Sequence, residues 1–226
     1  MKKNIYGLSR NIPLDVSDEV RRRSHYGCVI CGEIPYQFEH IEPEFKDAVE
    51  HNANNITLLC PTCHTKVTNG IISKLVVKKA TLNPYCKSNG YNFMGLAPSF
   101  NDFTFSFGNA KFVKPRFPII LNGIPIVAVN YDMRRETILL NCKFFDRLGH
   151  LVAEVIDNEW KTFIDGVDIK LIRKTLTVKR LNEKILSVTF EESNVIRVDY
   201  MHMIEPLPAK AGRIAQLLPC STGYGL

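Results

Sequence analysis

The chain has 226 residues, of which 45% are hydrophobic and 23% charged, and it carries a net charge of +6. This composition is that of a soluble globular protein with one large domain or two small ones. No apolar run approaches the roughly 20 residues that a membrane span needs, and the start "MKKNIYGLSRNIP" lacks the apolar core of a signal peptide. We therefore expect a cytoplasmic protein whose charge fits a polyanionic partner without proving one.

The first element that the pattern predicts is a short helix from Pro13 to Gly27. Asp15 or Ser17 can serve as its N-cap, and glycine ends it. "CVICGEIPYQFEHIEP" then indicates a turn and a short extended piece. "ITLLCPTCHTKVTNG" begins as an apolar strand or turn and continues as a short helix that ends at Gly70.

The sequence pattern changes after residues 82–100, which carry Pro, Gly, Asn and Ser without periodicity. We therefore place a domain boundary there. Seven short runs rich in β-branched and aromatic residues follow, with turn signals such as "LNGI" and "RLNEK" between them. The runs are "FTFSF", "PIILNGIPIVAV", "ETILLNCKFF", "HLVAEVI", "LTVKRL", "ILSVTF" and "VIRVDY". We expect an α+β chain with a small domain at 1–85, an all-β domain (sandwich, barrel or short β-solenoid) at 96–205, and a C-terminal tail at 206–226.

The seven cysteines do not fit a disulfide framework, because their number is odd and the expected compartment is reducing. Four of them form two pairs with C-x-x-C spacing, a pattern that in the cytosol usually indicates metal. The pairs are Cys28 with Cys31 and Cys60 with Cys63. The other three thiols are expected to be buried or incidental, namely Cys86, Cys142 and Cys220.

The two C-x-x-C pairs together predict a structural zinc site. Four thiolates make a tetrahedral Zn²⁺ site with no open position for a substrate. Such a site cross-links a region that is too small to be stable by burial alone, so without metal that region should largely unfold.

Four polar residues lie beside or between these pairs, and a zinc ion saturated by sulfur does not need them. They are Glu39 and His40 in "FEHIEP", and Asn55 and His64 in "NNITLLCPTCH". In this order and spacing they resemble the HNH endonuclease family, which is named for its His, Asn and His. The resemblance covers roughly residues 10–80 and implies a zinc-stapled ββα-metal nuclease domain that acts on DNA.

The resemblance also implies a role for each of these residues. His40 would be the general base that takes a proton from water, a task that histidine suits near neutral pH. Glu39 and His64 would hold one catalytic cation, Mg²⁺ or Mn²⁺, and Asn55 would pin the loop that orients the base. The commonest version of the motif has Asp or His where this chain has Glu39, which leaves the metal preference open.

Basic residues near the motif are candidates for contacts with the phosphates of DNA. Three arginines are consecutive in the first predicted helix, so they point to more than one of its faces. The candidates are Arg21, Arg22, Arg23 and Lys74. His51 is ambiguous: a solvated loop residue or a contact to the phosphate or the cation would both fit.

We therefore expect a metal-dependent endonuclease that hydrolyses DNA with one cation and a histidine base. A nuclease fused to an accessory domain is associated with phage defence or a mobile element, and a homodimer would offer two sites for two strands. The alternative is a non-catalytic zinc module that binds nucleic acid or mediates assembly. A thiol redox protein is a weaker third reading, because two C-x-x-C pairs explain zinc better.

Overall fold

The computed structural model describes residues 3–98, 100–191 and 194–202. These residues divide into two compact units. The first contains 3–94, 161–172 and 178–182, and the second contains 95–160, 173–177, 183–191 and 194–202, apart from residue 99. The tail expected at 206–226, with Cys220, lies outside the described residues. Within the described part of the chain, no helix is long and apolar enough to cross a membrane.

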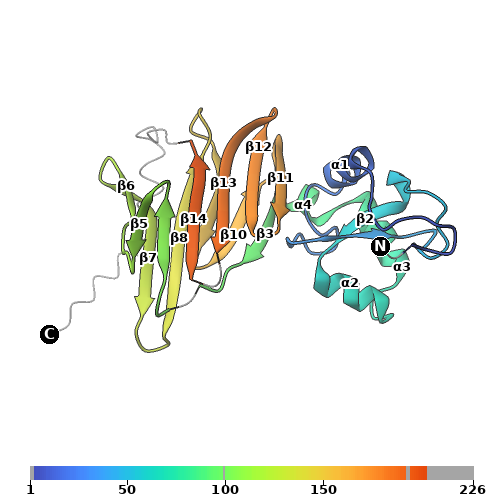
Figure 1. Ribbon diagram of the computed structural model, residues 1–226, viewed down its shortest axis with the longest axis horizontal. Helices are drawn as coiled ribbons and strands as arrows, with labels where there is room; N and C mark the ends of the chain where they lie inside the picture. The colour runs from blue at the N-terminus through green and yellow to red at the C-terminus, as the bar shows by residue number, and fades with distance from the viewer. Residues whose placement is uncertain (1–2, 99, 192–193, 203–226) are drawn as a thin grey trace. The chain divides into compact units, whose positions relative to one another are not determined.

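The first unit begins with the helix that the sequence predicts, α1 (Leu14–Arg23) (Figure 1). Pro13 occupies the N-cap position, and Asp15 lies in the first turn. Arginines fill the last turn, so both ends carry side chains whose charge complements the helix dipole. The residues after α1 lead into the first cysteine pair.

A strand–strand–helix motif follows, as the resemblance implies. β1 (Gln37–His40) pairs antiparallel with β2 (Ile56–Leu59), and α2 (Pro61–Thr68) starts immediately after β2. Proline at the first helical position fits the start of α2, because its missing N–H would have no helical partner there. The register places His40 opposite Ile56 at the end of β1.

Two helices after this motif were not predicted from the sequence. α3 (Lys74–Leu82) starts at Ser73, whose hydroxyl accepts a hydrogen bond from the Val76 N–H. α4 (Tyr85–Asn89) ends at Gly90 in a left-handed conformation. α4 lies within residues 82–100, where the sequence showed Pro, Gly, Asn and Ser without periodicity.

The core of the first unit lies on both sides of β2, whose four residues are all buried. Leu58 packs in a cluster with Val20 of α1, whereas Leu59 packs in a second cluster with Val67 of α2 and Val77 of α3. Three of the four paired cysteines belong to the second cluster. The helices therefore hold the ββα motif from two sides.

The β-rich part forms two six-stranded sheets (Figure 1). The first has the order β3 (Tyr91–Gly95), β10 (Glu159–Phe163), β9 (Leu151–Ile156), β8 (Thr137–Phe145), β7 (Ile124–Asp132) and β6 (Ile119–Leu121). The second has the order β11 (Val167–Ile172), β12 (Thr175–Arg180), β13 (Glu183–Glu191), β14 (Val195–Met201), β4 (Thr104–Phe107) and β5 (Ala110–Val113). The pairing is parallel between β14 and β4.

Each of the seven β-rich runs contains a strand, so the predicted fold class is confirmed. The turn signals also have a physical basis. Asn122 and Gly123 both have positive φ angles, as a two-residue type I′ hairpin requires. Trp160 on β10 is 1% exposed and contacts Phe190 on β13, which belongs to the other sheet. Side chains of both sheets thus share one core, which matches the sandwich among the three alternatives.

Candidate active site and metal centre

The two cysteine pairs come from two different local structures. Cys28 and Cys31 lie on a tight turn in which the Gly32 N–H donates to the Cys28 carbonyl at 2.8 Å. Gly32 has a φ of +83°, and a β-carbon there would meet the ring of Tyr85. Cys60 is the N-cap of α2, and its sulfur accepts a hydrogen bond from the Cys63 N–H at 3.4 Å. The local backbone therefore fixes where each pair points.

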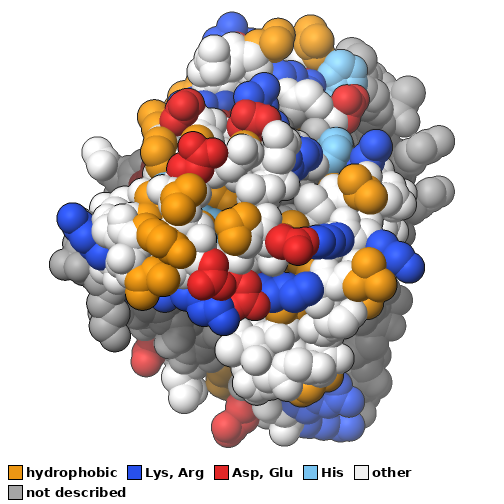
Figure 2. All heavy atoms as spheres, turned by 90° about the vertical axis from the view of Figure 1, so that its right-hand side faces the viewer, with side chains coloured by type: hydrophobic (Ala, Val, Ile, Leu, Met, Phe, Trp, Pro, Cys, Tyr) orange, Lys and Arg blue, Asp and Glu red, His pale blue; other side chains and the backbone are white. Residues whose placement is uncertain are grey.

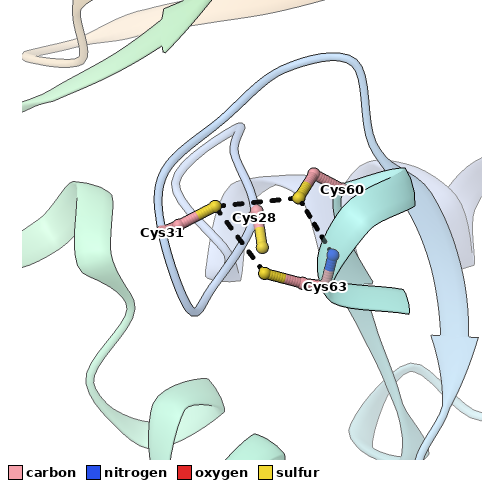
Figure 3. Close-up of side chains that lie close together, drawn as sticks. All are labelled: Cys28, Cys31, Cys60 and Cys63. Carbon is pink, nitrogen blue, oxygen red and sulfur yellow. Dashed lines mark hydrogen bonds between the residues drawn. The ribbon is translucent and has the colours of Figure 1, made fainter. Parts of the chain in front are cut away.

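The four sulfurs converge, as Figure 3 shows, and their Sγ atoms all lie within 4.8 Å of one another. The Cys31 sulfur is 3.7 Å from that of Cys60 and 3.8 Å from that of Cys63. Four thiolates arranged tetrahedrally with metal–sulfur bonds of about 2.3 Å have sulfurs about 3.8 Å apart. The cluster therefore fits a structural metal ion with four sulfur ligands.

Hydrogen bonding and burial change the acidity of these thiols in opposite directions. Hydrogen bonding by Cys31 and by backbone N–H groups lowers the pKa of Cys28 to about 5. Burial raises the pKa of Cys60 to about 12 and also raises that of Cys63. One thiolate thus forms readily in this cluster, and the others require a positive charge among the sulfurs, which a metal ion supplies.

A second group of polar side chains lies on the other side of the motif, around Glu39 of β1. Its Oε2 atom lies 3.0 Å from Nε2 of His64, which follows Cys63 in α2. Its Oε1 atom accepts a hydrogen bond from the Lys74 ammonium group at the start of α3. The Glu39 side chain is 15% exposed. Three elements, β1, α2 and α3, therefore each place one polar group at the same point.

His40 lies next to this group and is 8% exposed. Its Nε2 atom is 3.2 Å from Nδ1 of His51, and its ring contacts the ring of Phe45 edge to face. Burial, followed by the electrostatic effect of the neighbouring His51, lowers the pKa of His40 below its ordinary value. The ring is therefore neutral at neutral pH, which is the form that a base needs.

Glu39, His40 and His64 share one open cleft with a volume of about 1030 Å³. Side chains from the N-terminal segment, β1, the loop after it, α2 and α3 form its walls. The basic residues in these walls are Arg10, Lys46 and Lys74. The cleft therefore brings together two imidazoles, three cationic side chains and the carboxylates of Glu39 and Glu44.

Asn55 acts through its backbone in this structure. Its carbonyl accepts a hydrogen bond from the N–H of Ile41 at 2.8 Å, directly after the candidate base. Asn55 ends one turn of 3-10 helix (Ala53–Asn55), where the Asn52 side chain accepts a bond from the Asn54 N–H. This contact ties the end of β1 to the start of β2, which is the place where the resemblance implies that Asn55 holds the loop.

The three consecutive arginines have different environments. Arg21 is buried, and its guanidinium binds the carboxylates of Asp18 and Asp168, so it is engaged inside the protein instead of being available for a phosphate. Arg23 donates to backbone carbonyls, among them that of Ile56 at 2.7 Å. Arg22 is exposed. The guanidinium groups of Arg21 and Arg23 thus have partners within the protein, and the Arg22 side chain faces solvent.

The isolated thiols Cys86 and Cys142 are buried, as expected. At the candidate site, sequence reasoning missed Arg10 and Phe45 and left the role of His51 open. Arg10 lies over the ring of Phe45 at 4.6 Å, and His51 joins His40 from behind. A single Arg, Phe or His in a polar loop gives no periodic or spacing signal, so only the three-dimensional contact identifies them.

A comparison with known families agrees with this geometry. Residues 28–70 match the family model "HNH endonuclease", and this stretch includes all four clustered cysteines together with Glu39, His40 and His64. No curated protein and no solved structure matches the chain. The chain therefore carries an HNH endonuclease domain over residues 28–70, and the nuclease family to which this domain belongs acts on nucleic acids.

Proposed function

We propose that the protein is a metal-dependent endonuclease that hydrolyses phosphodiester bonds of DNA with one catalytic cation and His40 as general base. The observation that carries the proposal is the shared cleft. Glu39, His40 and His64 line it together, on a ββα motif that a four-cysteine cluster braces from behind. A purely structural role of the motif gives no reason for a buried base and a carboxylate to face an open cleft.

Two metal ions with separate tasks fit the residues. Zn²⁺ suits the four sulfurs and would be structural. Glu39 and His64 would hold Mg²⁺ or Mn²⁺, because octahedral ions with bonds of about 2.1 Å need neighbouring ligand atoms about 3 Å apart. The Glu39 Oε2 and His64 Nε2 atoms are 3.0 Å apart. This cation would supply charge stabilisation at the scissile phosphate and at the leaving oxygen.

The remaining steps belong to side chains of the chain itself. His40 takes a proton from the attacking water, and its lowered pKa keeps it in the accepting form at neutral pH. Lys74 holds the Glu39 carboxylate in place through a direct ion pair and brings a positive charge to the phosphate. Arg10 and Lys46 line the same cleft and would contact neighbouring phosphates.

In this proposal the protein binds DNA through contacts to the phosphate backbone of the DNA and not through contacts to the bases. On the face that Figure 2 shows, Lys and Arg side chains lie among Asp and Glu side chains and do not gather into one basic patch. The cationic groups of the cleft, with the exposed Arg22, would therefore position the phosphate chain locally. We propose no sequence preference for the cut.

The test is cleavage of supercoiled, linear and single-stranded DNA by the zinc-loaded protein with Mg²⁺ or Mn²⁺. The wild type should cleave, and His40→Ala should lower the rate by about 100-fold or more, as expected for a lost general base. His150→Ala is the matched control, because His150 lies in the second unit and pairs with Asp146 there. Equal rates for wild type and His40→Ala would show that His40 is not the general base. No cleavage of any substrate by the wild type would favour the non-catalytic zinc module.

A further inference from the structure

His51 lies in the loop after β1, and both of its ring nitrogens face a polar atom. Its Nδ1 atom is 3.2 Å from Nε2 of His40, and its Nε2 atom is 2.8 Å from the carbonyl oxygen of Ser9. The ring also stacks on Phe45, with an interplanar angle of 17°. His51 is not among the residues that line the cleft. It therefore stands behind the candidate base and not beside the substrate.

The Ser9 carbonyl decides which protons these rings carry. A carbonyl oxygen only accepts hydrogen bonds, so Nε2 of His51 must carry a proton. In neutral His51 the Nδ1 atom is then an acceptor, and Nε2 of His40 must be the donor between the two rings. A neutral His40 that donates from Nε2 has its lone pair on Nδ1. The chain of bonds from Ser9 through His51 thus leaves one nitrogen of His40 able to take a proton.

The Ser9 carbonyl is itself held in place. The Asn4 side chain donates to the carbonyls of Phe45 and Ala48 at 2.7 and 2.6 Å, which fixes the N-terminal segment to the loop that carries His51. A β-bridge between Lys3 and Ser9 closes this segment into a small turn. Segments far apart in the sequence therefore meet around one imidazole, which a solvated loop residue does not require.

We infer that His51 is a positioning residue that fixes the tautomer and the orientation of His40, so that Nδ1 of His40 takes the proton from water. The inference rests on the proposed function, because it assigns a supporting group to the proposed base. His51 plays the part that an orienting carboxylate plays in other sites with a histidine base, with a backbone carbonyl in turn fixing its own proton. Nothing in the residue types of "EHNANN" shows this role without the contact to Ser9.

The first measurement follows the ring nitrogens directly in the zinc-loaded, ¹⁵N-labelled full chain. Long-range ¹H–¹⁵N spectra distinguish protonated from unprotonated imidazole nitrogens. We expect both neutral rings to carry their proton on Nε2, with a scalar coupling across the hydrogen bond between His40 Nε2 and His51 Nδ1. A proton on Nδ1 of either neutral ring would overturn the inference. This readout does not depend on DNA cleavage, so it stays decisive even if the wild type proves inactive and the proposed function fails.

The second measurement compares two substitutions of the same residue. His51→Gln keeps an acceptor toward His40 and a donor toward Ser9, whereas His51→Leu removes both. We expect His51→Leu to lower kcat by about 10- to 100-fold with little change in KM, since orientation of a general base is lost, and His51→Gln to restore most of kcat. Unchanged kcat in His51→Leu, or equal loss in both variants, would overturn the inference. Zinc content and circular dichroism of both variants exclude those that fail to fold.

Discussion

Glu39 shows how one side chain can serve two partners at the candidate site. One of its oxygens contacts the Lys74 ammonium group, and the other lies 3.0 Å from the His64 ring. The ammonium orients the carboxylate, but it also places a positive charge beside the position proposed for the divalent cation. The same lysine should therefore favour the phosphate and oppose the metal.

Replacement of Lys74 by Met separates these two effects. Unit charges a few Å apart in aqueous surroundings interact by about 1 kcal/mol, so loss of the ammonium should tighten Mn²⁺ binding severalfold. The KM for DNA should rise, because a phosphate contact is lost. Mn²⁺ titration and steady-state cleavage measure the two quantities on one preparation. Weaker Mn²⁺ binding in the variant would show that the lysine supports the metal site instead.

The lowered pKa of His40 predicts the acid limb of the activity. Burial disfavours the charged imidazolium, so the folded pKa lies below the ordinary value of 6.5. A base is active when it is unprotonated, and kcat/KM should therefore rise with pH and reach half of its plateau below pH 6.5. A pH profile of plasmid cleavage at saturating metal gives this midpoint. A midpoint above 6.5 would contradict the buried, neutral base.

At the scale of elements, the cysteine cluster connects the parts of the ββα motif. Cys60 follows β2 and caps α2, while Cys28 and Cys31 lie on a turn whose Val29 N–H donates to the Leu58 carbonyl of β2 at 3.0 Å. The apolar clusters around β2 are small, so metal binding should supply much of the stability of this region. The β-sheets have a separate core that includes Trp160.

Removal of the structural metal should therefore unfold the motif selectively. A strong chelator should abolish the helical circular dichroism and make the four cluster thiols reactive toward iodoacetamide. Cys86, whose sulfur is 3.8 Å from the Gly32 carbonyl, should become reactive together with the four cluster thiols. Cys142 on β8 should stay protected. Peptide mapping by mass spectrometry assigns each site. Protection of the cluster thiols after complete metal removal would contradict the account.

The two thiols outside the cluster that the structure describes, Cys86 and Cys142, should be inert before chelation. Burial raises the pKa of Cys86 to about 12 and also raises that of Cys142. Thiolate, not thiol, is the reactive species, so neither residue should be alkylated at neutral pH in the metal-loaded protein. The same mapping experiment without chelator provides this control.

The elements also show what could be predicted from the sequence. Strands with turn signals and the strand before "CPTCH" were found because alternation, glycine and cysteine spacing are local signals. α3 was missed because Leu75 and Val76 are exposed and only Val77 is buried, so the helix has no apolar period. The buried state of Arg21 and the contact of His51 with Ser9 depend on partners far along the chain, which spacing does not reveal.

At the scale of the whole molecule, the net charge of +6 is larger than the positive charge that the candidate site offers to DNA. Acidic and basic groups are mixed on the face in Figure 2, and the cleft offers three cationic side chains, with Arg22 as a further candidate. A small number of phosphate contacts follows from this distribution. Their geometry would position the strand at the cleft, and their number would limit affinity.

The salt dependence of DNA binding tests this distribution. Each neutralised phosphate contributes about −0.9 to the slope of log K against log salt, so four contacts predict a slope near −4 or shallower. Fluorescence anisotropy with His40→Ala, which binds without cutting, measures the slope from low to moderate salt. A slope as steep as about −8 would require a basic surface beyond the cleft.

The central claim is that sulfur ligands hold one ion for structure while Glu39 and His64 hold another for chemistry. Mn²⁺ titration of the zinc-loaded protein, followed by electron paramagnetic resonance, tests it most directly when wild type and Glu39→Ala are compared. The account predicts one Mn²⁺ site in the wild type and its loss in Glu39→Ala, with zinc content and fold unchanged. Equal Mn²⁺ binding by both proteins, or no binding by the wild type, would contradict it.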